Sequence, residues 1–260
     1  MNNKKNSRYI ILSIVTIMFF IFVWYLATDV FKVASTTMLP SPLKVLKTFI
    51  IKFYNRNPDG ATMLQHLGAS MQVALSGYLM GVVVGFPLGI FMAWNKKADM
   101  FIRPLFDLIR PIPGLAWIPV MIVLFGIGLM SKAMVIFLSS FTVCVINAYS
   151  GINQTKSVHL WVGQTFGATS RQLLYRVAIP TSLPMLLTGL RVALGSSWGA
   201  LVAAEMLAST RGLGFMIQQS RGLGRPDVII AGMIAIGLVG AFLTYLLTLL
   251  EKSVLKGGRW

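Results

Sequence analysis

The sequence has few charged residues. Asp, Glu, Lys and Arg make up 12% of its 260 residues, whereas about a quarter is usual in a soluble globular domain. Hydrophobic residues make up 56%, and they gather in runs of about twenty, the length that crosses a bilayer as a helix. The composition excludes an ordinary soluble domain, a disordered chain and a disulfide-rich secreted fold, and it predicts an all-α integral membrane protein.

Acidic residues, histidines and cysteines are especially scarce. The seven acids are dispersed along the chain, His66 and His159 fall on opposite sides of the membrane in the topology below, and Cys144 is the single cysteine. These residues do not supply a metal site, a His-based triad or a membrane-embedded active site. We therefore expect no catalytic residue and no metal ligand in this chain.

A phosphate-binding loop is absent as well. The pattern G-x-x-x-x-G-K-[ST], whose backbone N–H groups cradle the phosphates of ATP, does not occur in the sequence. This chain therefore does not bind ATP through a P-loop, and energy for any work that it performs comes from a separate subunit or from an ion gradient.

Basic residues are the exception to the scarcity of charge. Lys and Arg number 23 against 7 Asp and Glu, and the formal net charge is +16. Because the cations lie between apolar runs, they favour loops at lipid headgroups over a nucleic-acid-binding face. Basic residues before the first run predict a cytoplasmic N-terminus over residues 1–8, followed by a single transmembrane domain over 9–260.

Six apolar runs predict six transmembrane helices, with both termini in the cytoplasm. The expected spans are Tyr9–Thr28, Gly68–Trp94, Ile112–Met130, Ala133–Ile152, Leu183–Leu207 and Val228–Leu250. On the outer side, Ser41-Pro42 is a typical helix start, and Leu43, Leu46, Ile50 and Phe53 follow at helical spacing. This pattern predicts a short amphipathic helix that either lies on the membrane surface or packs against the spans.

Two spans contain residues that disturb or specialise a helix. In the second span, glycines every four residues keep to one face, which favours tight helix packing over a direct solute path. They are Gly77, Gly81, Gly85 and Gly89. The third span opens with Arg110-Pro111-Ile112-Pro113-Gly114 and contains Trp117 and Pro119. These prolines predict either broken backbone beside a pathway or a re-entrant turn at the interface.

The longest polar stretch between the late spans is Asn153–Pro180, which is cytoplasmic in the predicted orientation. Within it, Trp161–Tyr175 is interpreted as a helix with Gly167-Ala168 near its middle. A glycine there costs about 1 kcal/mol relative to alanine. That cost favours a partner surface that approaches the backbone closely.

Here the sequence resembles a known family. Gly167, nine further residues and then Val177-Ala178-Ile179-Pro180 resemble the G-x9-I-x-L-P pattern of ABC importer permeases. In that family the loop forms a short coupling helix that docks on the ATPase subunit. The family's Glu-Ala-Ala before the glycine is replaced by Trp161, Val162 and Gly163, so a salt bridge from that Glu to the ATPase is not expected.

The resemblance covers nearly the whole chain, and the chain is similar to one branch of the family. That branch imports aliphatic sulfonates, taurine, nitrate and related small anions. The segments that carry it are Leu39-Pro40-Ser41-Pro42, Arg110-Pro111-Ile112-Pro113, Ala116-Trp117-Ile118-Pro119, Phe125-Gly126-Ile127-Gly128, Trp198, Val202-Ala203-Ala204-Glu205-Met206 and Gly212-Leu213-Gly214.

The resemblance implies a type I ABC importer permease fold in a bacterial cytoplasmic (inner) membrane. It also implies a homodimer with a second permease copy, two ATPase subunits that bind ATP and Mg²⁺, and an extracytoplasmic substrate-binding protein. No cofactor is expected on this chain itself. The residues that it implies for ATPase coupling are Gly163, Gln164, Thr165, Phe166, Gly167, Ala168, Thr169, Arg171 and Pro180.

Polar and aromatic residues within the spans are the candidates for the pathway or its gate. Glu205 is the acid within the predicted spans, and it either acts in gating or pairs with a nearby arginine such as Arg211. Ser196, Ser197 and Trp198 lie midway along the same span and either contact solute or bond to neighbouring helices. Trp117 is a further pathway candidate because it follows the broken backbone.

The sequence thus favours the permease subunit of a binding-protein-dependent importer that works by alternating access. Sulfonate or taurine is the preferred substrate, followed by nitrate, cyanate or bicarbonate, and then by aromatic carboxylates or vitamin precursors. The alternative is a gradient-driven secondary carrier or channel, which typically has inverted repeats or several ionisable groups at mid-membrane.

Overall fold

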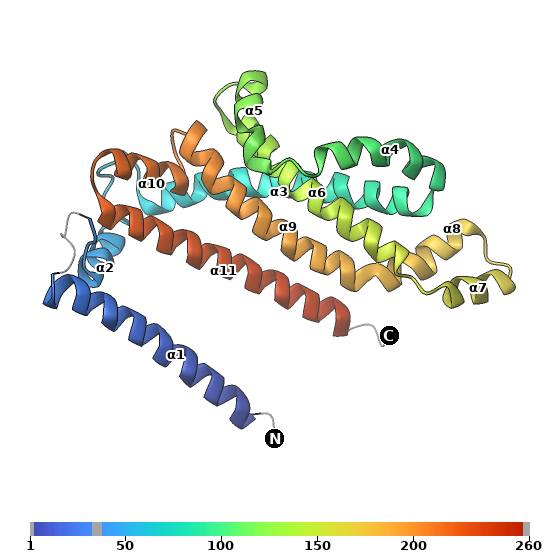
Figure 1. Cartoon of the computed structure of the whole chain (residues 1–260), viewed down its shortest axis with the longest axis horizontal. Coiled ribbons are helices and arrows are strands. Elements are labelled where there is room, and N and C mark those ends of the chain that lie inside the picture. The colour runs from blue at the N-terminus through green and yellow to red at the C-terminus, as the bar shows by residue number, and fades with distance from the viewer. Residues whose placement is uncertain (1–2, 33–37, 257–260) are drawn as a thin grey trace. The chain divides into compact units, whose positions relative to one another are not determined.

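The computed structural model describes residues 3–32 and 38–256, and every regular element in these ranges is helical (Figure 1). The chain divides into two compact units. Unit 1 contains the described residues up to His66 together with Met216–Ala235. Unit 2 contains Leu67–Phe215 and the described residues from Ile236 onward.

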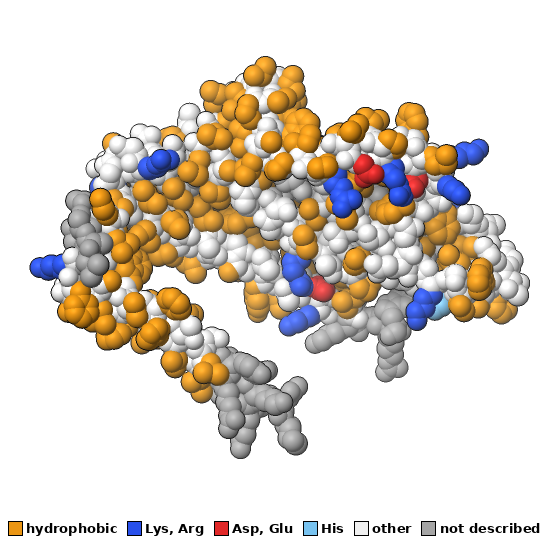
Figure 2. Space-filling model, viewed as in Figure 1, with side chains coloured by type: hydrophobic (Ala, Val, Ile, Leu, Met, Phe, Trp, Pro, Cys, Tyr) orange, Lys and Arg blue, Asp and Glu red, His pale blue; other side chains and the backbone are white. Residues whose placement is uncertain are grey.

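Five helices are long and apolar enough to cross a membrane. They are Ile11–Val30, Met63–Trp94, Leu129–Asn153, Ser170–Ala208 and Pro226–Leu255. They correspond to α1 (Asn3–Tyr25) with η1 (Leu26–Val30), α3 (Met63–Trp94), α6 (Leu129–Asn153), α8 (Ser170–Leu173) with η3 (Leu174–Ala178) and α9 (Ile179–Ala208), and α11 (Pro226–Lys256). Hydrophobic side chains cover much of the viewed surface, and cations gather over α4 (Figure 2). The all-α membrane fold is confirmed.

The third expected span, Ile112–Met130, is wrong as a continuous helix. The structure has α4 (Lys96–Ile109), then η2 (Gly114–Trp117) and α5 (Ile118–Phe125), and the axis bends by 83° at the break. The eight residues of α5 rise only about 12 Å, well short of a bilayer core of about 30 Å. Pro111 and Pro113 lack the N–H groups that a continuous helix needs at this point. Six spans result only if the bent pair counts as one.

In unit 1, the outer segment forms α2 (Pro42–Ile51). The Ser41 side chain accepts a hydrogen bond from the backbone N–H of Lys44 at 3.4 Å, which confirms the predicted helix start. Leu43, Leu46 and Ile50 are all more than half exposed. These three side chains of the predicted apolar stripe are therefore left largely exposed.

Lys52 follows α2. As a cation between two apolar runs it was expected in a loop at the lipid headgroups, but the structure buries it. Its side chain is 2% exposed and forms an ion pair with Asp59, while Nζ also donates to the carbonyl of Ala61 at 2.7 Å. His66 Nε2 lies 3.3 Å from the other Asp59 oxygen. Burial raises the pKa of the Asp59 carboxyl, but the hydrogen bonds and charges of His66 and Lys52 outweigh burial and leave that pKa below its usual value. These charges stabilise the loop between α2 and α3.

In unit 2, α3, α6 and α9 pack around one apolar core that includes Tyr78, Ile136 and Leu201. The four glycines of α3 face α6. A Cβ atom on Gly77 or Gly89 would lie 2.5 Å from a carbonyl oxygen of α6, closer than real side chains approach. The absence of side chains at this stripe therefore allows the two helices to touch.

Candidate functional site

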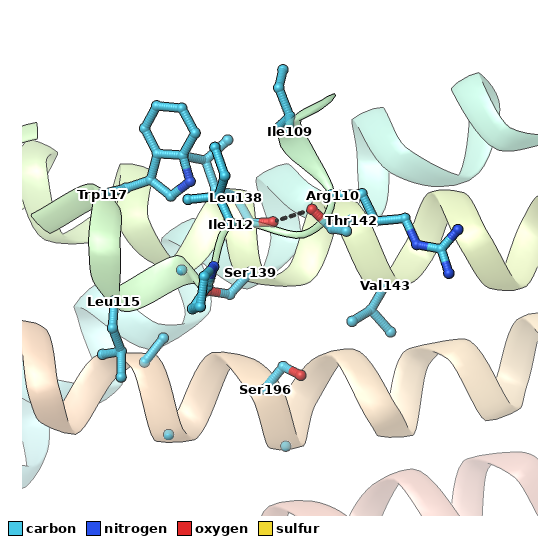
Figure 3. Close-up of a pocket in the computed structure, with 15 residues that line it drawn as sticks. Ile109, Arg110, Ile112, Leu115, Trp117, Leu138, Ser139, Thr142, Val143 and Ser196 are labelled. Atoms are coloured by element: carbon cyan, nitrogen blue, oxygen red, sulfur yellow. Dashed lines mark hydrogen bonds between the residues drawn. The ribbon is translucent and has the colours of Figure 1, made fainter. Parts of the chain in front are cut away.

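A pocket of about 400 Å³ lies where the bent pair meets the middle of α6 and α9 in unit 2 (Figure 3). The break between α4 and α5 contributes Arg110 and Trp117, α6 contributes Ser139 and Thr142, and α9 contributes Ser196. The prolines of the break prevent helix from filling this space. The volume lies within the usual range for small-molecule sites, about 300–1,000 Å³.

The three hydroxyl groups of the pocket are not equivalent. Ser139 Oγ donates to the carbonyl of Val135 at 3.0 Å, and Thr142 Oγ1 donates to the carbonyl of Leu138 at 2.9 Å. Both hydrogens are thus committed to the backbone of α6. Within the described ranges, Ser196 Oγ makes no hydrogen bond and is exposed. Ser196 is therefore the hydroxyl that can donate to a bound solute.

Two glycines of α9 leave the pocket open. Gly195 and Gly199 line it, and a Cβ atom on either would have no atom within 4 Å. Both lie on the same helix as Ser196. From Gly195 to Gly199, α9 therefore presents backbone atoms and the Ser196 hydroxyl to the cavity. A larger side chain at either glycine would enter the cavity.

Arg110 forms the charged wall of the pocket. It caps the C-terminal end of α4, where a cation is favourable beside the helix dipole. In Figure 3 its side chain extends past Thr142, on the side away from Trp117 and Ser139. Arg110 also borders a second cavity of about 250 Å³, together with Arg103, Asp107 and Tyr149.

The structure brings some of the expected pathway residues together and separates others. Trp117 and Ser196 line the pocket, whereas Ser197, Trp198 and Glu205 do not. Ser197 is buried, since adjacent helical residues point about 100° apart. Trp198 Nε1 donates to the carbonyl of Ile236 at 3.1 Å, which joins α9 to α11.

Glu205 lies in a buried polar cluster and is 1% exposed. It accepts hydrogen bonds from Ser70 Oγ, at 2.7 Å, and from the backbone N–H of Gly214, at 2.8 Å. Ser70 Oγ in turn accepts from the N–H of Leu213, at 2.9 Å. The cluster joins α3 and α9 to the start of α10 (Leu213–Gly222). These contacts give Glu205 a role in holding three elements together.

The expected helix over Trp161–Tyr175 is also wrong as one element. The segment contains α7 (Ser157–Thr165), a turn and α8. Gly167 has φ +74°, and its N–H bonds to the Gln164 carbonyl while the N–H of Ala168 bonds to that of Gly163. This pair of bonds is the Schellman motif, which favours glycine at this position. The glycine is therefore explained by the turn.

Most of the coupling residues expected from the resemblance lie in one run, 163–169, and most are exposed. Gly163, Gln164 and Thr165 end α7, Phe166–Thr169 form the turn, Arg171 lies in α8, and Pro180 lies in the first turn of α9. Phe166 is 87% exposed. Thr169 and Gln172 form a capping box that starts α8. The segment is thus a short helical hairpin at the ends of α6 and α9 (Figure 1).

Sequence reasoning missed several residues of the pocket, Ser139 and Thr142 among them. Arg110 was interpreted as a loop cation, and Gly195 and Gly199 drew no attention. Their spacing of four, with Ser196 beside the first, was a signal for a small-residue face on α9. Sequence alone did not indicate whether another helix covers that face.

Known proteins resemble this chain over most of its length. Residues 85–256 match the family described as binding-protein-dependent transport system inner membrane component. The chain is 35% identical over 248 residues to the taurine transport system permease protein TauC of Escherichia coli (strain K12), covering 95% of this chain and 90% of that protein. It is 31% identical over 224 residues to the putative aliphatic sulfonates transport permease protein SsuC of Bacillus subtilis (strain 168), covering 86% and 79%.

A solved structure shares the fold. The chain superposes on a subunit of the MetNI methionine ABC transporter in an inward-facing conformation with a TM-score of 0.63 and 18% identity, over 75% of this chain and 95% of that one. The identity is too low to carry anything beyond the fold. Together with the family match and the relatives above, these findings establish that the chain belongs to the binding-protein-dependent transport system inner membrane components, the permease subunits of ABC importers.

Proposed function

We propose that this chain forms the solute pathway of an ATP-driven importer for a small anion, with taurine or another sulfonate preferred. An extracytoplasmic binding protein delivers the solute, and a separate ATPase that binds ATP and Mg²⁺ supplies the energy. The names of the relatives TauC and SsuC support the substrate class. The N- and C-termini lie in the cytoplasm, in a bacterial inner membrane.

One observation carries the mechanism: the two helices that line the pocket are joined by the exposed hairpin. α6 ends at Asn153 and α9 begins at Ile179, with α7, the turn and α8 between them. Both helices line the pocket through residues near their middles. A force applied to the hairpin by the ATPase therefore reaches two walls of the pocket, as alternating access requires.

The hairpin has the features of a docking surface. Trp161, Val162 and Phe166 are apolar and more than half exposed, and a cluster of exposed apolar side chains is typical of a protein interface. The hairpin is braced from within, because Leu173 occupies the space that a Cβ on Gly163 would need. Trp94 Nε1 also donates to Ser170 Oγ at 3.1 Å. A braced hairpin transmits motion better than a loose loop.

A second copy of the chain completes the pathway in this proposal. The element η2, which lines the pocket through Trp117, leads directly into α5, on which Val123 is 84% and Leu124 65% exposed. A two-fold axis would place the same apolar surface of both copies together, as in most homodimers. The assembly is then two permeases, two ATPases and one binding protein.

The first test is purification of the tagged chain from its native host in mild detergent, with mass spectrometry of the proteins that accompany it. We expect a P-loop ATPase in equal amount. The complex is then placed in proteoliposomes with the binding protein, and taurine uptake is measured with and without ATP. Uptake that is equal without ATP would contradict the proposal and favour a gradient-driven carrier.

Phe166→Asp tests the docking surface. Because Phe166 is almost fully exposed, the substitution leaves the fold intact, whereas any side chain at Gly167 would strain the turn. We expect the ATPase to be lost from the purified complex. Tyr54→Asp, at an 86% exposed position of unit 1, is the matched control and keeps the ATPase. Retention of the ATPase by Phe166→Asp would place the docking surface elsewhere.

A further inference from the structure

We propose that Arg110, with the Ser196 hydroxyl, holds the anionic group of the solute in the pocket of unit 2. The inference rests on the proposed function and deepens it, because it names the residue that selects for negative charge. The basis is that Arg110 and Ser196, whose hydroxyl is free, both line one otherwise mostly apolar cavity.

The position of Arg110 along the spans is the first observation. The pocket that it lines lies beside Thr142 and Ser196, which are near the middle of helices of 25 and 30 residues. A charge at the middle of a membrane span is costly, and such residues usually serve a pathway. The helix dipole of α4 stabilises a cation at this end, but it does not account for a cavity beside the guanidinium.

The second observation is that the Arg110 guanidinium has no carboxylate partner within 4.0 Å in the described part of the chain. Three other arginines are paired: Arg103 lies 2.6 Å from Asp99, Arg225 lies 2.8 Å from Asp227, and Arg191 pairs with Glu251. The remaining arginines whose side chains are described also lack a carboxylate partner, and Arg110 differs from them in lining the pocket. Asp107 borders the second cavity with Arg110 but is not bonded to it. Arg110 therefore keeps its donors for a ligand.

The chemistry of these donors fits an oxyanion. A guanidinium presents five N–H groups in a planar fork that matches two oxygens of a sulfonate, carboxylate or nitrate. Ser196 adds one O–H, while Ser139 and Thr142 donate to their own helix. Ile112, Leu115 and Leu138 line the rest of the pocket, which suits a short organic tail. One cation and one hydroxyl hold an anion reversibly, as a transporter needs.

The test uses the complete complex in proteoliposomes, with ATP inside and taurine, nitrate and bicarbonate as probes. Arg110→Gln is expected to lower uptake of the transported anion about tenfold or more, the size of a lost charge-assisted bond. Arg110→Lys keeps more uptake because it keeps the charge. Stimulation of ATP hydrolysis by the loaded binding protein stays unchanged in both, which a merely structural role would not predict. Arg56→Gln, which removes an exposed charge in unit 1, is the control and transports normally.

A charge-rescue experiment covers the case in which Arg110→Gln does not fold. Arg110→Cys is made in a Cys144→Ala background, so that the new thiol is the single one, and is treated with cationic, neutral and anionic methanethiosulfonates. We expect the cationic reagent to restore uptake and the other two to fail. Equal effects of the three reagents, or wild-type uptake by Arg110→Gln, would overturn the inference. Absence of ATP-dependent uptake by the wild-type complex would instead contradict the proposed function.

Discussion

The glycines of α3 and the glycines of α9 share a spacing and differ in what faces them. Gly77, Gly81, Gly85 and Gly89 recur every four residues, and a Cβ on each would overlap atoms of α6. Gly195 and Gly199 are also four apart, yet a Cβ on either would meet nothing within 4 Å. The first set lets two helices touch, and the second keeps a cavity open.

This difference shows what helical spacing can and cannot establish. A repeat of four places small residues on one face of a helix, and it does so for α3 and α9 alike. Whether that face is covered depends on which other helices of the same chain lie beside it. α6 runs along the stripe of α3, whereas the broken backbone between α4 and α5 leaves the face of α9 uncovered. Substitutions at the two sets should therefore have opposite consequences.

The largest expected effect is on the packed stripe. In Gly81→Leu the new Cβ would lie 2.7 Å from the Ser140 Cβ and 2.8 Å from the backbone nitrogen of Phe141. Overpacking of a core usually costs about 1–3 kcal/mol, and clashes with backbone should bring this variant to the upper end or beyond. The measurement is thermal unfolding in detergent. Gly68→Leu, on the same helix with open space at its Cβ, should unfold like the wild type.

The second effect is on transport without loss of stability. Leucine at Gly199 projects into the pocket, and it improves helix propensity by up to about 1 kcal/mol. We expect Gly199→Leu to be at least as stable as the wild type and to transport at least about tenfold more slowly, a barrier of about 1.4 kcal/mol or more. Gly237→Leu on α11, another position with open space, is the control with normal uptake. Clear destabilisation by Gly199→Leu would mean that the face is packed after all.

A smaller effect is expected at the buried polar cluster around Glu205. Ser70→Ala removes a donor to the buried Glu205 and an acceptor for the N–H of Leu213. Leaving buried polar groups unsatisfied costs about 1–3 kcal/mol, so the melting temperature should fall. Ser76→Ala is the matched control on α3, because Ser76 Oγ bonds only to the carbonyl of Val73. Equal melting temperatures for the two variants would show that the Glu205 cluster adds little.

The smallest effect concerns pH and the buried charges of unit 1. The pKa of Asp59 is below its ordinary value of 3.8, so folding favours the carboxylate. Its contribution to stability is present above pH 4 and is lost as the pH falls through the folded-state pKa. We expect the loss of stability on acidification to be smaller in Asp59→Asn, as read from melting temperatures at about pH 7 and about pH 2, which lie on either side of the titration. If the wild type and Asp59→Asn lose the same stability on acidification, groups other than Asp59 cause that loss.

The sequence indicated the features that depend on local pattern. Apolar runs predicted the helices, Ser41-Pro42 predicted the start of α2, and the ordered segments around Gly167 and Glu205 identified the family. Features that depend on tertiary contacts were missed or misplaced. The sequence predicts Lys52 at the surface. In the structure it is buried, because Asp59, seven residues later, folds back and forms an ion pair with it.

The pocket is the clearest case of this limit. Its walls come from three separate segments, and the 83° bend that opens it depends on how α4 and α5 are held by α6. Prolines marked the break, but they did not give its angle or the position of the Arg110 side chain. Ser196 and Ser197 looked equivalent in sequence, and only the orientation of α9 separates them.

The most direct test of the pathway compares the wild type with Gly199→Leu in the complete complex. Taurine uptake into proteoliposomes is measured with and without ATP, at equal amounts of folded permease. We predict ATP-dependent uptake by the wild type and a loss of about tenfold or more in Gly199→Leu. ATP-dependent uptake of equal rate in both would show that solute does not pass through this pocket, and the central claim would be wrong.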